Sequence, residues 1–180
     1  MGTILKMQPA LKRDLWSHLL PSDSSKEQAA FLFCSYEEIG ENIEFTILDI
    51  SFLVTKDFAA QYGDHLEMKD STRISLIKRA HVLGATLVEI HSHPKPWPAA
   101  FSYSDRIGLE QTVPHMRWRL KKRPYIAIVV APSGFDALIW YGDNMDPESL
   151  TGIKVGDTLL TPTNISKGGW NEDSRQSIRS

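Results

Sequence analysis

The chain has 180 residues, of which 42% are hydrophobic and 23% are charged, ordinary values for one globular domain with one core. Its formal net charge of −2 gives no reason to expect nucleic acid or an anionic membrane as a partner. No apolar run reaches the roughly 18 residues of a membrane helix, and the N-terminus lacks the apolar core of a signal peptide. Because Cys34 is the one cysteine, no intramolecular disulfide can form, and we expect a reducing cytoplasm.

The first third of the chain predicts one helix and two paired strands. Pro9 fits the first turn of a helix whose leucines repeat every four residues, and Pro21 stops it. The apolar run 29–34 indicates a buried strand, 37–42 indicates a turn, and 45–54 indicates a second strand that pairs back on the first. A looser stretch follows to about residue 68, with a turn at residues 63–64.

The middle of the chain predicts a helix followed by a short strand. Asp70 or Ser71 can cap a helix that runs to Leu83, and Gly84 suits the positive φ that follows a helix. We expect this helix to bury one face, made of Leu76, Ile77, Ala80 and Leu83. Residues 86–90 are then predicted to form a buried strand.

The last part predicts a further helix, a strand pair and a polar end. A Pro-rich loop at 94–101 leads to a helix after Ser102, which Pro114 is expected to kink or end. Strands are expected at 125–131 and 135–141 around a turn. The fold class is therefore α/β (α+β) with a mixed sheet. We expect one domain over residues 1–150 and a partly flexible C-terminal extension over residues 151–180.

Two histidines at the end of the strand predicted over 86–90 point to a metal. Side chains alternate along a strand, so the imidazoles of His91 and His93 lie on the same side and can share one ion. An H-x-H pair alone also occurs in strands that bind no metal. A catalytic zinc usually keeps three protein ligands and an open position for water, so a third ligand is needed.

Asp105 is the best candidate for the third ligand. It lies in the first turn of the helix beyond the Pro-rich loop, where the loop can curl back and place a carboxylate opposite the histidines. Ser102 and Asp105 also have the spacing of a simple helix cap. A cap alone does not explain why it follows a strand that ends in His-Ser-His-Pro, so the two signals together predict a metal centre.

The strings His91-Ser92-His93-Pro94 and Ser102-Tyr103-Ser104-Asp105 resemble the signature of the JAMM (MPN-plus) zinc metalloproteases, H-[ST]-H-P followed by a short loop and S-x-x-D. The resemblance covers roughly residues 9–142, and the loop here is one residue longer than the usual form. It implies an MPN/JAB-like fold, a curved mixed β-sheet flanked by helices. It also implies one zinc ion per chain, held by His91, His93 and Asp105.

The resemblance further implies a general base and an oxyanion donor. The base is a glutamate in a pattern like E-x-x-G-x-L-x-G, which Glu27 matches best, with Ala30 and Cys34 in place of the glycines. Glu27 would take a proton from the zinc-bound water and pass it to the leaving amine. Ser102 would donate a hydrogen bond to the oxyanion of the tetrahedral intermediate.

Two further residues are candidates for substrate binding. Glu89 lies two residues before His91, and on the same face it could act as base, ligand or partner of a ligand. By family position we favour an orienting or substrate-contacting role for Glu89. Trp97, in the Pro-rich loop, either packs against the C-terminal tail of a substrate or covers the domain's own edge.

The resemblance implies an isopeptidase or peptidase that cleaves after the C-terminal tail of a ubiquitin-like protein. The compact form resembles bacterial relatives encoded beside ubiquitin-like proteins and their activating and conjugating enzymes, including antiphage defence operons. Residues 170–176 weakly resemble the closing segment of such domains. The alternative function is a metal-free MPN scaffold that serves as an interaction module, against which the presence of all the motif residues argues.

Other reactive or charged residues have simpler explanations. Cys34 has apolar neighbours and is expected in the core rather than as a nucleophile. The remaining histidines lack the spacing of ligands and are expected to be exposed or hydrogen-bonded. The basic and aromatic run 117–123 suits a helix C-terminus as well as it suits nucleic acid. The slightly acidic charge of the whole chain argues against nucleic acid, and an acidic protein is the more plausible partner of the run.

Overall fold

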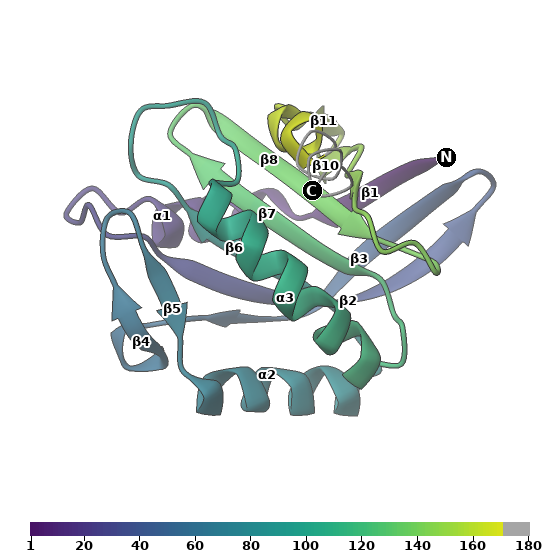
Figure 1. Ribbon diagram of the computed structural model, residues 1–180. Coiled ribbons are helices and arrows are strands. Elements are labelled where there is room, and N and C mark those ends of the chain that lie inside the picture. The colour runs from purple at the N-terminus through teal and green to yellow at the C-terminus, as the bar shows by residue number, and fades with distance from the viewer. Residues whose placement is uncertain (171–180) are drawn as a thin grey trace, which may run out of the picture.

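A computed structural model describes residues 1–170 (Figure 1). The helices are α1 (Pro9–Leu19), α2 (Asp70–Leu83) and α3 (Tyr103–Arg119), with a 3-10 turn η1 (Thr55–Asp57). Residues 165–170 are also helical. The strands are β1 (Gly2–Met7), β2 (Ala29–Ile39), β3 (Asn42–Phe52), β4 (Phe58–Gln61), β5 (Leu66–Met68), β6 (Thr86–Ser92), β7 (Tyr125–Ala131), β8 (Gly134–Trp140), β9 (Glu148–Ser149), β10 (Gly152–Val155) and β11 (Thr158–Leu160).

One curved, mixed sheet organises the described residues (Figure 1). Its nine strands follow the order β11-β10-β1-β3-β2-β6-β7-β8-β9. The pairs β1–β10, β1–β3 and β6–β7 are parallel, and the other pairs are antiparallel. Strands β4 and β5 form a separate hairpin. The chain is thus a single mixed α/β domain, and β6, whose end holds the two histidines, lies next to the central strand β2.

Both faces of the central strands are buried because helices cover each side. Phe31 and Phe33 of β2 pack in one apolar cluster with α2 and α3, whereas Ala30 and Leu32 pack in a second cluster with α1. Such strands are continuous apolar runs rather than alternating ones. This explains why the run at 29–34 was correctly predicted as a buried strand, as were the strands around the turn before Gly134.

Several predicted elements are confirmed with different limits. The first helix spans Pro9–Leu19 as expected, with Pro at its first turn. The predicted turn at 37–42 is wrong in extent, because β2 continues to Ile39 and pairs with β3 from Asn42, which leaves Gly40 with a φ of 61° at the turn. The polar end of this hairpin is exposed, and exposed strand ends resemble turns in composition.

The second helix is confirmed over Asp70–Leu83, and Gly84 has the expected φ of 61°. The predicted cap is wrong: Lys69 is the N-cap residue and makes no side-chain cap hydrogen bond. Leu83 is also 40% exposed and does not join the buried face. The third helix does not end at Pro114 but continues to Arg119, since Met116, two residues beyond the proline, is buried against the sheet.

Elements that pair over long sequence distances were not predicted. No element was predicted before Pro9, but strand β1 lies there and pairs with both β3 and β10. The stretch to residue 68 contains the β4–β5 hairpin, with its bend at residues 63–64 as expected. Of the extension expected at 151–180, strands β10 and β11 belong to the main sheet. Residues 171–180 lie outside the described part of the chain, together with most of the 170–176 segment.

Two arginines of the basic run at 117–123 connect separate segments of the fold through hydrogen bonds to backbone carbonyls. Arg117 is buried and donates to the backbone carbonyls of Lys122, Arg123, Gly142 and Asn144. Arg123 donates to the carbonyls of Ala80 and Ala85 at 3.1 and 2.6 Å, where helix α2 ends. Arg123 thus adds donors at the C-terminal end of α2, and Arg117 connects the turn after α3 to the loop after β8.

No helix in residues 1–170 combines the length and apolar character needed to cross a membrane.

Cys34 tests the packing of the core directly. Its side chain is fully buried, and burial raises the pKa of the thiol to about 12. Because only the thiolate reacts, we predict that folded protein does not react with Ellman's reagent at pH 8 and reacts fully after denaturation in guanidinium chloride. Fast stoichiometric labelling of the folded chain would contradict this packing.

Candidate metal centre

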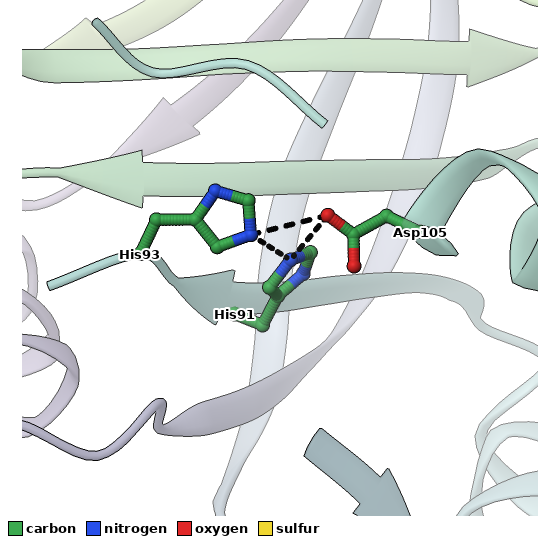
Figure 2. A group of neighbouring side chains, drawn as sticks. All are labelled: His91, His93 and Asp105. Atoms are coloured by element: carbon green, nitrogen blue, oxygen red, sulfur yellow. Dashed lines mark hydrogen bonds and ion pairs between the residues drawn. The ribbon is translucent and has the colours of Figure 1, made fainter. Parts of the chain in front are cut away.

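The end of strand β6 holds His91 and His93 on one side of the sheet. His91 is opposite Ala29 of β2 and Val129 of β7, so hydrogen-bonded strands fix it on both sides. The chain remains extended beyond the strand because the His93 backbone N–H donates to the Val130 carbonyl at 2.8 Å. The alternation of β6 is therefore preserved as far as His93, and the two imidazoles face the same space, as predicted (Figure 2).

The first turn of helix α3 brings Asp105 to the same point (Figure 2). Ser102 is the N-cap residue, and its Oγ accepts a hydrogen bond from the Asp105 backbone N–H at 3.1 Å. In return, the Asp105 carboxylate accepts from the Ser102 N–H at 2.8 Å. This reciprocal capping box fixes the side chain of Asp105. The cap and the metal ligand, which the sequence presented as alternatives, thus coexist in one residue.

The three donor atoms form a triangle of nearly equal sides. The distances are 3.2 Å between His91 Nε2 and His93 Nε2, 3.5 Å between His91 Nε2 and Asp105 Oδ2, and 3.1 Å between His93 Nε2 and Asp105 Oδ2. Donors at about 2.0–2.1 Å from a tetrahedral metal ion lie roughly 3.3 Å from each other. The triangle therefore matches one face of a tetrahedron, and the three residues could hold a metal ion.

Glu27, the residue expected to be the general base, lies beside this triangle. Its carboxylate is buried, and its Oε1 is 3.7 Å from His93 Nε2. It precedes strand β2, whose Ala29 faces His91 across the sheet. The Glu27 backbone is held from the β4–β5 side, because its N–H donates to the Tyr62 carbonyl at 2.7 Å and its carbonyl accepts from Gln61 Nε2 at 2.9 Å.

Ser92, between the two histidines, holds the segment of Glu27 in place. Its side chain is fully buried, and its Oγ accepts from the Gln28 N–H at 2.9 Å. The Ser92 N–H donates in turn to the Gln28 carbonyl at 3.0 Å. Sequence reasoning missed this role, although a buried hydroxyl between two ligands has to find a partner. Ser92 thus couples the histidine strand to the glutamate.

Burial and charge shift the pKa values of these groups in opposite directions. Burial raises the pKa of Glu27, and the neighbouring His91 and His93 offset this only in part. Burial alone would also raise the pKa of Asp105, but His91 and the hydrogen bonds from both histidines and from Ser102 hold it well below its ordinary value. For His91, burial lowers the pKa, but Asp105 and then Glu27 outweigh burial, so it is raised overall. One carboxyl group is therefore held ionised, while the other is kept ready to take up a proton.

Glu89 lies on the same face of β6 as His91, as expected, but it is not part of the triangle. Its carboxylate accepts a hydrogen bond from the hydroxyl of buried Tyr125 on strand β7. Burial raises the pKa of Glu89, and this hydrogen bond partly lowers it again. Tyr125 was not singled out from the sequence, because its position on an apolar strand indicates only a core residue.

A second set of buried contacts ties the Pro-rich loop to the C-terminal end of the described chain. The buried carboxylate of Asp136 accepts from the backbone N–H groups of Asn164 and Ser166 at 3.0 and 2.9 Å. Ser166 Oγ accepts from the Phe101 N–H at 2.8 Å, directly before the cap of α3. The Phe101 ring lies 5.8 Å from that of His91. Residues 161–166 therefore support the loop that delivers Asp105.

The remaining candidate residues lie apart from the metal triangle. Trp97 is 65% exposed, and the Lys95 Nζ lies 5.1 Å from its ring centroid. His18 contacts the Ala29 carbonyl through Nε2 at 2.9 Å, and His115 stacks on Trp118. These histidines are hydrogen-bonded or exposed, as predicted.

Replacing Ser92 tests the coupling between the histidine strand and the glutamate. We predict that Ser92→Ala lowers the free energy of unfolding by about 1–3 kcal/mol, because the Gln28 N–H loses its acceptor in a partly buried site. Urea unfolding of this variant should be compared with that of Ser17→Ala, which changes an exposed serine on α1. Equal midpoints for the two variants would show that the Ser92 hydroxyl contributes nothing.

A scan of the sequence against protein-family models and a search of the curated proteins both returned no match. What the site can do is therefore inferred from its donor atoms, their spacing and the residues that surround them.

Proposed function

We propose that this chain is a zinc-dependent isopeptidase or peptidase of the JAMM type, which cleaves after the C-terminal tail of a ubiquitin-like protein. The observation that carries the proposal is the triangle of His91, His93 and Asp105 with the buried Glu27 beside it. The Ser102 cap next to the triangle completes the set of residue types that the motif requires. On this proposal the domain has the MPN/JAB-like fold. It acts in the cytoplasm of a bacterium, beside activating and conjugating enzymes, in a ubiquitin-like conjugation or antiphage defence operon.

Zinc fits this donor set. Two imidazole nitrogens and one carboxylate oxygen, spaced for a tetrahedron with one open corner, are typical of catalytic zinc sites. Magnesium and calcium take six or more oxygen donors, which these side chains do not offer. When bound, zinc supplies Lewis acidity that polarises a carbonyl and acidifies a water molecule.

Glu27 then transfers the proton, and Ser102 stabilises the developing negative charge. Glu27 takes a proton from the attacking water as a C–O bond forms at the carbonyl carbon of the substrate. The C–N bond breaks next, and Glu27 returns that proton to the leaving amine. Burial raises the pKa of Glu27, which suits a group that must both accept and release a proton near neutral pH.

Within residues 1–170 the Ser102 hydroxyl donates to no other group, which leaves its proton for the developing oxyanion. Its Oγ is already an acceptor for the Asp105 N–H, so its own O–H proton remains available to a substrate. A donor of this kind lowers the barrier by about 3 kcal/mol. The side chain is exposed at the edge of the triangle, where a carbonyl can approach it.

Zinc binding separates this proposal from the alternative of a metal-free scaffold. We predict about one zinc per chain after metal-replete purification, measured by elemental analysis, and a melting temperature that rises with zinc concentration. Less than about a tenth of an equivalent would favour the scaffold. Asp105→Asn, which removes the charge of one donor, should reduce both the zinc content and the thermal shift.

The affinity for zinc should fall as the pH falls. Only the neutral imidazole ligates zinc, and Asp105 keeps His91 protonated to a higher pH than an ordinary histidine. Below that raised pKa, zinc must displace a proton, so the apparent Kd should rise about tenfold per pH unit for each proton displaced. Competition titrations with a chromophoric chelator between pH 8 and pH 5.5 measure this slope. A Kd that is independent of pH would exclude the histidines as ligands.

Two variants test the catalytic roles on a fusion of a ubiquitin-like protein to a reporter. We predict that Glu27→Gln lowers kcat about 10²–10⁴-fold because the proton acceptor is lost. Ser102→Gly should lower kcat about 10²–10³-fold, while glycine still tolerates the N-cap position at a cost of a few tenths of a kcal/mol. Exposed Glu41→Gln is the control for charge. Cleavage that resists a chelator, or that is unchanged in Glu27→Gln, would refute the mechanism.

A further inference from the structure

A cavity of about 470 Å³ continues from the metal triangle toward the β4–β5 hairpin. Glu27, His91, Ser102 and Asp105 line its active end. Beyond them its walls are apolar and come from the core cluster and the hairpin, at Phe31, Leu53, Phe58, Leu66, Met68 and Leu109. This volume exceeds what an attacking water molecule needs and suits a side chain with an aliphatic stem.

Glu89 places a carboxylate in this apolar lining. It is opposite Phe31 in the pairing of β2 and β6, and it lines the cavity beside His91. Within residues 1–170 the one hydrogen bond to this carboxylate comes from the Tyr125 hydroxyl. An ionised carboxylate can accept about four hydrogen bonds, so most of its capacity is open to a ligand. A half-buried carboxylate with unused capacity is stabilised by a donor that enters the cavity.

The other charges that line the cavity favour a cation. Apart from Glu27 and Asp105, which belong to the reaction, the lining contains the carboxylates of Asp64, Glu67 and Glu89. Arg73 is the one Lys or Arg among the lining residues, and in residues 1–170 it has no ion pair within 4.0 Å. Asp64 and Glu67 belong to the hairpin, and Glu67 faces exposed His65 at 3.9 Å. With three carboxylates and one guanidinium, this part of the lining has an excess of negative charge, which favours a positively charged ligand.

We infer that this cavity is a specificity pocket for a basic residue of the substrate next to the scissile bond, with Glu89 as the residue that recognises it. The inference rests on the proposed function, since it concerns a substrate of the same site. The aliphatic stem of the arginine or lysine lies between the apolar walls, and its charged end donates to Glu89. Tyr125 orients the carboxylate from behind, so that its free acceptor sites face the cavity.

Fluorogenic peptides with an alanine–glycine background test this pocket. Each contains arginine, its uncharged analogue citrulline, or glutamate at one of the four positions before the cleaved bond. At one position the zinc-loaded wild type should cleave the arginine peptide about tenfold or more faster than the citrulline peptide, because a charge-assisted hydrogen bond is lost in the latter. Anisotropy with the same peptides and zinc-loaded Glu27→Gln measures the same preference in binding alone.

Variants of Glu89 and Arg73 test which residues of the lining set the preference. In Glu89→Gln, which still accepts from Tyr125, the ratio of arginine to citrulline should fall to within about twofold. In Arg73→Gln it should increase, because a competing cation is gone. Exposed Glu110→Gln on α3 is the matched control and should keep the wild-type ratio. Zinc content and melting temperature verify that each variant is folded. If Glu89→Gln does not load zinc, the arginine-to-citrulline ratio of Arg73→Gln serves as the test of the pocket instead.

The outcomes separate the pocket from the reaction. If the protein cleaves the peptides without preferring arginine at any position, the inferred specificity pocket is wrong, but the proposed peptidase activity is not. The same holds if the preference for arginine is unchanged in Glu89→Gln. If no peptide is cleaved but the arginine peptide binds about tenfold more tightly, and Glu89→Gln abolishes this difference, the pocket is supported and the proposed peptidase activity is wrong. Absence of both cleavage and preferential binding overturns both.

Discussion

The Asp105 carboxylate joins helix α3 to the end of strand β6, and the rest of the site is arranged around it. Its Oδ2 accepts from the Ser102 N–H and lies within 3.5 Å of both histidine Nε2 atoms. A helix N-terminus favours a negative charge at this position, and the capping box fixes its rotamer. The third corner of the donor triangle is therefore built into the start of the helix and does not depend on a mobile side chain.

The other parts of the site are coupled to this corner through the backbone. Ser92 connects the histidine strand to Gln28 and thereby sets the position of Glu27. Asp136 and Ser166 hold the loop from the opposite side, directly before the cap. Buried polar groups with satisfied hydrogen bonds rigidify such an arrangement. The histidines, the glutamate and the capping serine are thus held on separate elements whose relative positions are fixed, which is what a proton transfer over a short distance requires.

The parts of the site that follow from local rules were predictable from the sequence. The alternation of a strand placed His91 and His93 together, and the spacing of a helix cap placed Asp105 beside Ser102. Glu27 was found only through the resemblance to a family, since its position depends on the pairing of β2 with β6. The contacts of Ser92, Asp136 and Ser166 that support the site join residues at least 28 positions apart, and no local pattern indicates such contacts. For the same reason β1 and β10, which pair across most of the chain, were missed.

X-ray absorption at the zinc edge of the purified protein tests the central claim most directly, because it reports the donor atoms themselves. The account predicts about four nitrogen or oxygen donors at about 2.0–2.1 Å, with the outer-shell scattering of two imidazoles. These signals should weaken in step when His91 or His93 is replaced by alanine. A sulfur donor at about 2.3 Å, a six-coordinate oxygen shell without imidazole, or no specifically bound zinc would contradict it.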